Sequence, residues 1–208
     1  MAETPTLTNH DIVSHFAKLK PENVKFKLNN GADSFSILHL NVRSLNDKMG
    51  QLEVLLDEID IQFHCIVITE TWFDNHTFIG KFSLSGYNVF HNSRSDKNGG
   101  GVAVYVCDRL DVRETAVRLE GCESLLLQLG ESGRELCSVL AVYRAPSGSL
   151  PAFLSDLSRV LSGLPSSSFV VGDINIDLNF ENSCDANSEN YLNLMSKNGF
   201  FNTIHTPT

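Results

Sequence analysis

Residues 34–69 read SFSILHLNVRSLNDKMGQLEVLLDEIDIQFHCIVIT, and the order of patterns in this stretch decides the fold. Residues 34–42 and 61–69 are apolar runs that predict strands. Between them, residues 47–59 predict an amphipathic helix, because apolar side chains recur at helical spacing: Met49, Leu52, Leu55, Leu56 and Ile59. Strand, helix and strand in this order predict a parallel pair joined by a right-handed crossover.

The middle of the chain has a different pattern. Five strand-like runs separated by short turns indicate antiparallel meanders: 87–90, 101–107, 112–119, 124–129 and 135–143. A helix over 151–161, a strand over 168–172 and a helix over 188–198 follow. Together these segments predict an α/β fold of two mixed sheets packed face to face, with helices on the outer faces.

Composition narrows the class of protein. The 208 residues are 42% hydrophobic, which suits one domain with a substantial core. A net charge of -9 argues against a globally basic surface for nucleic acid. The five cysteines are an odd number without a Cys-x-x-Cys pair, so we expect reduced thiols in an intracellular protein.

The N-terminal segment carries no strong strand pattern. We interpret residues 1–33 as a leader, partly disordered or with a short helix over 11–19, and residues 34–208 as the domain. The first residues contain no basic start followed by an apolar stretch, so the sequence does not indicate a signal peptide. No apolar run approaches the roughly 20 residues that span a bilayer, so we expect no membrane partner.

Polar side chains follow four of the predicted strands, and they suggest one site. These residues are Asn41, Glu70, Tyr143, and Asp173 with Asn175. In open α/β sheets the crevice beyond the strand ends is where ligands bind, so these groups would form one acidic pocket if the ends converge.

The chemistry of these groups suits a phosphodiester. Asn41 and Glu70 offer the hard oxygen ligands that Mg²⁺ prefers, and Asp173 could orient or deprotonate a water. Asn175 and Tyr143 could donate to the phosphate. These are the parts of metal-assisted phosphodiester hydrolysis.

Each residue taken singly also has a structural interpretation. Asn41 could be a turn or helix-entry residue, Glu70 a solvated strand end, and Asp173 with Asn175 a Gly-Asp turn. All of these must hold at once to explain the coincidence, which weakens them together. Asp177 and Asn179 are interpreted as surface loop, because strand alternation ends soon after Gly172.

Basic residues and glycines lie near the same strand ends. Five cations would border the pocket and could hold a polyanion locally: Arg43, Lys48, Arg94, Lys97 and Arg144. Of these, Arg43 and Arg144 are the expected substrate contacts. Scattered solvated charges remain the alternative. Gly99-Gly100-Gly101 leads into a strand and lacks Gly-Lys-Ser/Thr, so it predicts a tight turn or close backbone approach and not a phosphate loop.

Five short motifs, in this order, resemble the endonuclease/exonuclease/phosphatase family. They are Leu40-Asn41-Val42-Arg43-Ser44-Leu45, Ile68-Thr69-Glu70-Thr71-Trp72, Gly99-Gly-Gly-Val-Ala-Val, Val142-Tyr143-Arg144-Ala145-Pro146 and Gly172-Asp173-Ile174-Asn175. More narrowly, the segment from about Phe35 to the C-terminus is similar to the apurinic-type endonuclease domain of non-LTR retrotransposons.

The resemblance implies a four-layer α/β/β/α sandwich and DNA nicking with Mg²⁺, or Mn²⁺ as an alternative. It implies that Asn41 and Glu70 hold the metal and that Asp173 positions the attacking water. Asn175 resembles the asparagine that contacts the scissile phosphate, and Tyr143 the tyrosine that approaches it. Such a domain would be nuclear when functional.

The resemblance departs at two points. Ser147 stands where the family often has Asn, and the sequence stops at His205-Thr206-Pro207-Thr208 before any segment like the family's closing Ser-x-x-Asp-His. We therefore expect a domain that lacks its last segment and is impaired, with the reverse transcriptase domain of a full-length polyprotein absent. A phosphoinositide or other phosphoester phosphatase of the same fold is one alternative, and an inactive remnant or binding module is another.

Overall fold

The computed structural model describes residues 25–26, 35–94, 99–178 and 185–202. Its elements, in chain order, are β1 (Lys25–Phe26), β2 (Phe35–Asn41), α2 (Met49–Ile59), β3 (Cys65–Thr69), the 3-10 helix η2 (Ile79–Phe82), β4 (Tyr87–Asn92), β5 (Val102–Cys107), β6 (Asp111–Thr115), β7 (Cys122–Glu131), β8 (Arg134–Arg144), α3 (Leu150–Leu161), β9 (Ser168–Asp173) and α4 (Ala186–Lys197).

The first sheet has the strand order β1-β2-β3-β5-β4. Its β2 and β3 are parallel, joined through α2, with Ile37 opposite Cys65 and Asn41 opposite Thr69. This confirms the strand-helix-strand prediction for residues 34–69. The antiparallel β5 pairs with β3, and β4 forms the edge beside β5.

The second sheet has the order β6-β7-β8-β9. Strands β6, β7 and β8 form the antiparallel meander that the sequence predicted. The chain then crosses through α3 and returns as β9, parallel to β8, with Tyr143 opposite Asp173.

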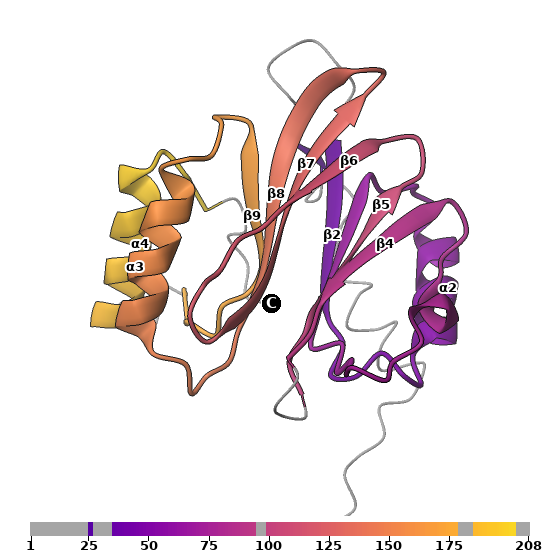
Figure 1. The fold of residues 1–208 in the computed structure, drawn as a ribbon, viewed down its shortest axis with the longest axis horizontal. Coiled ribbons are helices and arrows are strands. Elements are labelled where there is room, and N and C mark those ends of the chain that lie inside the picture. The colour runs from indigo at the N-terminus through magenta and orange to yellow at the C-terminus, as the bar shows by residue number, and fades with distance from the viewer. Residues whose placement is uncertain (1–24, 27–34, 95–98, 179–184, 203–208) are drawn as a thin grey trace, which may run out of the picture.

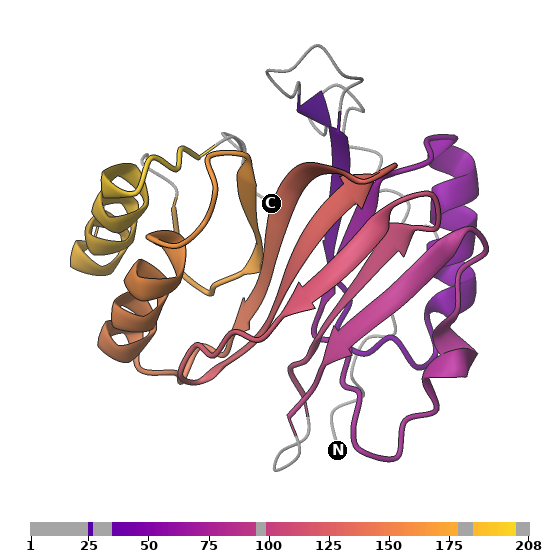
Figure 2. The ribbon, with the colours of Figure 1, turned by 45° about the horizontal axis from the view of Figure 1, so that its top comes forward.

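Four layers result, as Figure 1 shows: α2 covers the outer face of the first sheet, and α3 and α4 cover the outer face of the second. Figure 2 shows the same order of layers after the molecule is turned. The sheets bury a shared apolar core between them, to which β3, β5 and β8 contribute completely buried residues such as Val67, Val104 and Val139. The predicted α/β/β/α sandwich is therefore confirmed.

Local sequence explains where the helices begin. Ser149 caps α3 by accepting a hydrogen bond from the Ala152 N–H, and Pro151 occupies the first turn, where its missing N–H costs nothing. Asp185 caps α4 by accepting from the Ser188 N–H. Helix α2 ends at Ile59, and its C-cap Asp60 donates the last helical N–H bond, to the Leu56 carbonyl, before its left-handed φ of 51° turns the chain away.

Several details differ from the sequence-based expectations. Lys25 and Phe26 pair with β2, so part of the segment assigned to the leader adds a strand to the first sheet. The helix expected over 11–19 lies outside the described residues.

Four cysteines are free thiols, as predicted: Cys65, Cys107, Cys122 and Cys137. In the described ranges, no helix combines the length and apolarity needed to cross a membrane.

Candidate active site

The predicted polar strand ends converge. Asn41 ends β2 and Glu70 follows β3, and because these strands are parallel and in register, both side chains lie at the same edge of the first sheet. Tyr143 and Asp173 are paired at the matching ends of β8 and β9. The two sheets face each other, so the four residues meet where the strands of both sheets end.

The centre of this group is the side-chain amide of Asn41. Its Nδ2 donates to Oε1 of Glu70 at 2.8 Å and to Oδ2 of Asp173 at 2.7 Å. Its Oδ1 accepts a bond from the Arg43 N–H at 3.3 Å. One amide therefore links the carboxylates of both sheets, which only a side chain with two N–H donors can do.

The segment that carries Glu70 has an unusual backbone. Glu70 and Trp72 have φ values of 55° and 58°, a region in which large side chains are rare. The Ser44 N–H donates to the Glu70 carbonyl at 2.7 Å, and the Trp72 N–H donates to the Gly100 carbonyl at 2.9 Å. Flanking loops thus hold the segment on both sides.

The glycines at 99–101 allow one of these loops to approach closely. All three have positive φ, and a Cβ on Gly101 would lie 2.4 Å from Oγ1 of Thr71. A Cβ on Gly100 would lie 2.6 Å from Oε2 of Glu123. The predicted close backbone approach is confirmed, and it lets this turn pack directly against the Glu70 segment.

A largely buried ion pair stabilises the glycine turn at residues 99–101. Arg94 donates to Glu123 through Nε and Nη2, each at 2.8 Å, and the Gly101 N–H donates to the same carboxylate at 3.1 Å. The Arg94 and Glu123 side chains are 19% and 8% exposed. This predicted rim cation is therefore engaged in the scaffold, and Lys97 lies outside the described residues.

The turn after β9 fixes Asp173. Its Oδ1 accepts from the Asn175 N–H at 3.0 Å, while Asn175 itself adopts a φ of 50°. The Asn175 amide donates to the Arg144 carbonyl at 2.8 Å. Gly172 makes this arrangement fit, because a Cβ there would lie 1.9 Å from the Val142 carbonyl oxygen.

Tyr143 is only 6% exposed and lies close to both carboxylates. Burial raises the pKa of its phenol, and the negative charges of Glu70 and Asp173 raise it further. The hydroxyl therefore stays protonated at neutral pH and remains able to donate a hydrogen bond.

The cations differ in how they are placed. Arg43 is exposed, with a φ of 45°, beside Asn41. The Lys48 ammonium donates to the carbonyls of Val42 and Arg43, and burial followed by repulsion from Arg43 lowers its pKa. Arg144 is 5% exposed.

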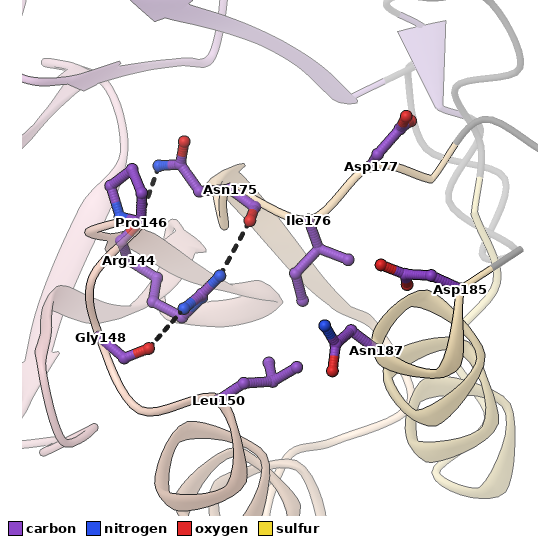
Figure 3. A pocket seen from close by; sticks show the side chains of 9 residues that line it. All are labelled: Arg144, Pro146, Gly148, Leu150, Asn175, Ile176, Asp177, Asp185 and Asn187. Atoms are coloured by element: carbon purple, nitrogen blue, oxygen red, sulfur yellow. Dashed lines mark hydrogen bonds between the residues drawn. The ribbon is translucent and has the colours of Figure 1, made fainter. Parts of the chain in front are cut away.

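The Arg144 guanidinium donates to three backbone carbonyls, those of Ile174, Gly148 and Asn175, at 2.7 to 2.8 Å. It also lies 5.9 Å above the Phe153 ring. Figure 3 shows two of these hydrogen bonds, beside a cavity of about 260 Å³ between the β9 turn and the N-termini of α3 and α4. This placement favours a structural role for Arg144 over the substrate contact that its sequence position suggested.

Sequence reasoning missed His39. This residue precedes Asn41 by two positions and therefore lies on the same face of β2. A hydrogen bond of 3.1 Å joins its Nε2 to Oγ1 of Thr69. Burial lowers its pKa to about 4, although the Asp173 charge acts in the opposite direction. Strand alternation counted backwards from Asn41 would have placed His39 beneath the site.

The oxygen atoms around Asn41 suit a metal ion. Across the part of the chain that is described, no three His, Cys, Asp or Glu side chains are grouped to hold one. The centre offers two carboxylates and one amide, linked through Asn41. Mg²⁺ commonly takes one or two carboxylates and keeps several waters, so this oxygen-rich set fits it.

The four layers of this chain recur in proteins of known structure. No family model matches the sequence. Among the similar solved structures is an AP endonuclease from Archaeoglobus fulgidus. The similarity covers 77% of this chain and 70% of that chain, with 18% identity and a TM-score of 0.55. The similarity to the AP endonuclease LMAP from Leishmania major covers 85% of this chain and 72% of that chain, with 14% identity and a TM-score of 0.57.

A third solved structure, the 3'-5' exonuclease NExo from Neisseria meningitidis, covers 77% of this chain and 70% of its own. Its identity is 18% and its TM-score 0.52. These likenesses confirm the fold that the motif resemblance implied. At such identities they establish the fold alone, so the chemistry rests on the residues of this chain.

Proposed function

We propose that this chain is a divalent-metal-dependent phosphodiesterase whose substrate is DNA. The observation that carries the proposal is the Asn41 amide, which links the carboxylates of Glu70 and Asp173 from two different sheets. Linking two acids at one point concentrates negative charge where a cation is stabilised. Similarity of the fold to AP endonucleases supports a phosphodiester as the substrate.

Glu70 and Asn41 are the residues that would hold Mg²⁺ or Mn²⁺. Turning the Asn41 amide about its last side-chain bond exchanges nitrogen and oxygen, so the group that now donates to Glu70 could present its oxygen to a cation. When bound, the ion supplies Lewis acidity to a phosphoryl oxygen.

Asp173 orients the attacking water and accepts its proton. Its Oδ1 is fixed by the Asn175 N–H, which leaves Oδ2, at present bonded to Asn41, as the oxygen that meets the water. Tyr143 donates its hydroxyl proton to the phosphate as a hydrogen bond, because its raised pKa keeps it neutral.

Asn175 is the second phosphate donor, although its present bond to the Arg144 carbonyl must give way for that contact. Arg43, exposed beside Asn41, contacts the flanking phosphates.

The retrotransposon-type motifs around Asn41 and Glu70 support DNA nicking as the form of the reaction. The test is conversion of supercoiled plasmid to the nicked form by the purified chain with Mg²⁺. Nicking should disappear in Glu70→Ala and Asp173→Ala and persist in Asp177→Ala, an exposed carboxylate of the same turn.

Two other outcomes would redirect the proposal. Hydrolysis of a phosphoinositide or another phosphoester, with DNA left intact, would assign the site to a phosphatase. Mg²⁺ binding by calorimetry without turnover on any phosphoester would assign it to a binding module.

A further inference from the structure

Trp72, the single tryptophan of the chain, lies beside the proposed metal ligand. Its indole N–H points at Oε2 of Glu70, 3.4 Å away, while 44% of the residue surface is exposed. A tryptophan with a partly exposed ring and a polar edge is suited to contact a ligand, because the ring is a large apolar surface and the N–H is already hydrogen-bonded.

The backbone holds this ring in place at a cost. A φ of 58° at a bulky residue is strained by about 1–2 kcal/mol. Such strain persists only where neighbours impose it, and it is concentrated at functional sites. The neighbours here are the Gly100 carbonyl, which accepts from the Trp72 N–H, and Thr71, which is completely buried against Gly101.

Gly99 lies beside the edge of the indole. A Cβ at this position would lie 3.7 Å from Nε1 of Trp72, an ordinary contact distance. The ring is thus fixed at its backbone and at its N–H, and part of its surface stays accessible next to the carboxylate.

From this geometry we propose that Trp72 is a stacking platform for a nucleobase adjacent to the scissile phosphate. The inference rests on the proposed function, because a phosphate bound to a metal ion at Asn41 and Glu70 would bring the neighbouring nucleoside within reach of the indole. Stacking on an aromatic side chain contributes about 1–3 kcal/mol per base and tolerates any sequence.

Intrinsic fluorescence tests this directly, since all tryptophan emission of the wild-type chain comes from position 72. A short single-stranded oligonucleotide with a non-cleavable backbone, added with Mg²⁺, should quench the emission. An abasic oligonucleotide of equal length carries the same phosphates, so it should leave the emission nearly unchanged. Equal quenching by both, or quenching by neither at concentrations that saturate binding, would overturn the stacking proposal.

Two variants separate stacking from simple orientation of Glu70. Trp72→Ala should raise the KM or Kd for the base-carrying oligonucleotide by about 5- to 150-fold, the range that corresponds to stacking energies. Its affinity for the abasic oligonucleotide should fall less than its affinity for the base-carrying one, because the abasic oligonucleotide offers no base to stack. Trp72→Phe keeps a ring but has no N–H, so it should retain most of the oligonucleotide affinity.

If Trp72→Phe instead loses as much as Trp72→Ala, and Mg²⁺ affinity falls in both, the residue acts through Glu70 and the stacking proposal is wrong. The fluorescence experiment needs no variant and no turnover. It therefore decides the stacking proposal even if the chain proves unable to cleave DNA, which would be the failure of the proposed function.

Discussion

The Asn41 amide donates to Oδ2 of Asp173 across 2.7 Å, although 132 positions separate the two residues in the chain. Asn41 ends β2 in the first sheet and Asp173 ends β9 in the second. The site therefore exists only when the two sheets are packed on each other, and the apolar core between them determines its geometry.

Replacing Asn41 should weaken metal binding. In Asn41→Ala the carboxylates of Glu70 and Asp173 lose the amide that joins them, and the cation loses a ligand oxygen. We expect Mg²⁺ affinity, measured by calorimetry, to fall by about 10- to 100-fold. Asn46→Ala, a nearby exposed asparagine, should bind Mg²⁺ as the wild type does. Unchanged affinity in Asn41→Ala would remove Asn41 from the metal site.

Gly172 should tolerate no side chain. An added Cβ would lie 1.9 Å from the Val142 carbonyl oxygen, so β9 would have to move away from β8 and carry Asp173 with it. We expect Gly172→Ala to lower the free energy of unfolding by about 1–3 kcal/mol or more, measured by urea denaturation.

Gly50→Ala is the matched control for Gly172→Ala. Gly50 lies in α2, and an added Cβ meets nothing within 4 Å. Alanine is favoured over glycine in helices, so we expect a gain of about 0.5–1 kcal/mol. Similar losses in both variants would show that the close approach at Gly172 is unimportant.

Most elements of the fold were predictable, the helices because each buries one face and the central strands β3 and β5 because they are continuous apolar runs. Residues 47–59 predicted a helix, and α2 buries Leu52 and Leu55 as that periodicity requires. Strand pairing was less accessible: nothing local indicates that β5 inserts beside β3, because pairing depends on the whole sheet. The two-residue β1 is too short to give a period-two pattern at all.

The convergence of the polar strand ends was predictable, and the contacts around them were less so. Asn41, Glu70 and Asp173 follow apolar strands, so their polarity is conspicuous in the sequence. Arg144 looked equally suited to substrate, yet its guanidinium serves backbone carbonyls. Such use depends on which carbonyls the tertiary fold leaves without partners, which no sequence pattern shows.

The pair of Arg94 and Glu123 should be strongly stabilising relative to a broken pair. Glu123→Gln removes a charge that accepts two bonds from Arg94 and one from the Gly101 N–H. We expect a loss of about 3 kcal/mol in the free energy of unfolding, because one buried charge is left poorly compensated. The Trp72 emission should also shift, since the Trp72 N–H bonds to the Gly100 carbonyl of the same turn.

Glu131→Gln provides the comparison for Glu123→Gln. Glu131 lies 3.7 Å from Arg109, and the two side chains are 48% and 44% exposed, so its loss should change stability by less than about 1 kcal/mol. Equal effects of the two substitutions would contradict the importance of burial at Glu123.

His39 should make the stability of the fold depend on pH. Burial holds the pKa of His39 at about 4 in the folded chain, against 6.5 for an unperturbed histidine. Between these values the unfolded chain binds a proton that the folded chain excludes, so stability rises with pH. The contribution is present in full above about pH 6.5 and is lost as pH falls towards 4, up to about 3 kcal/mol.

The measurement is urea denaturation at several pH values between 4 and 6.5 for wild type and His39→Gln, which keeps a polar partner for Thr69. The variant should show a shallower dependence on pH in this window. Because burial is the main cause, the difference should survive high salt, which screens exposed charges but not desolvation. Equal slopes in the two proteins would show that His39 is charged in the folded chain or does not control this transition.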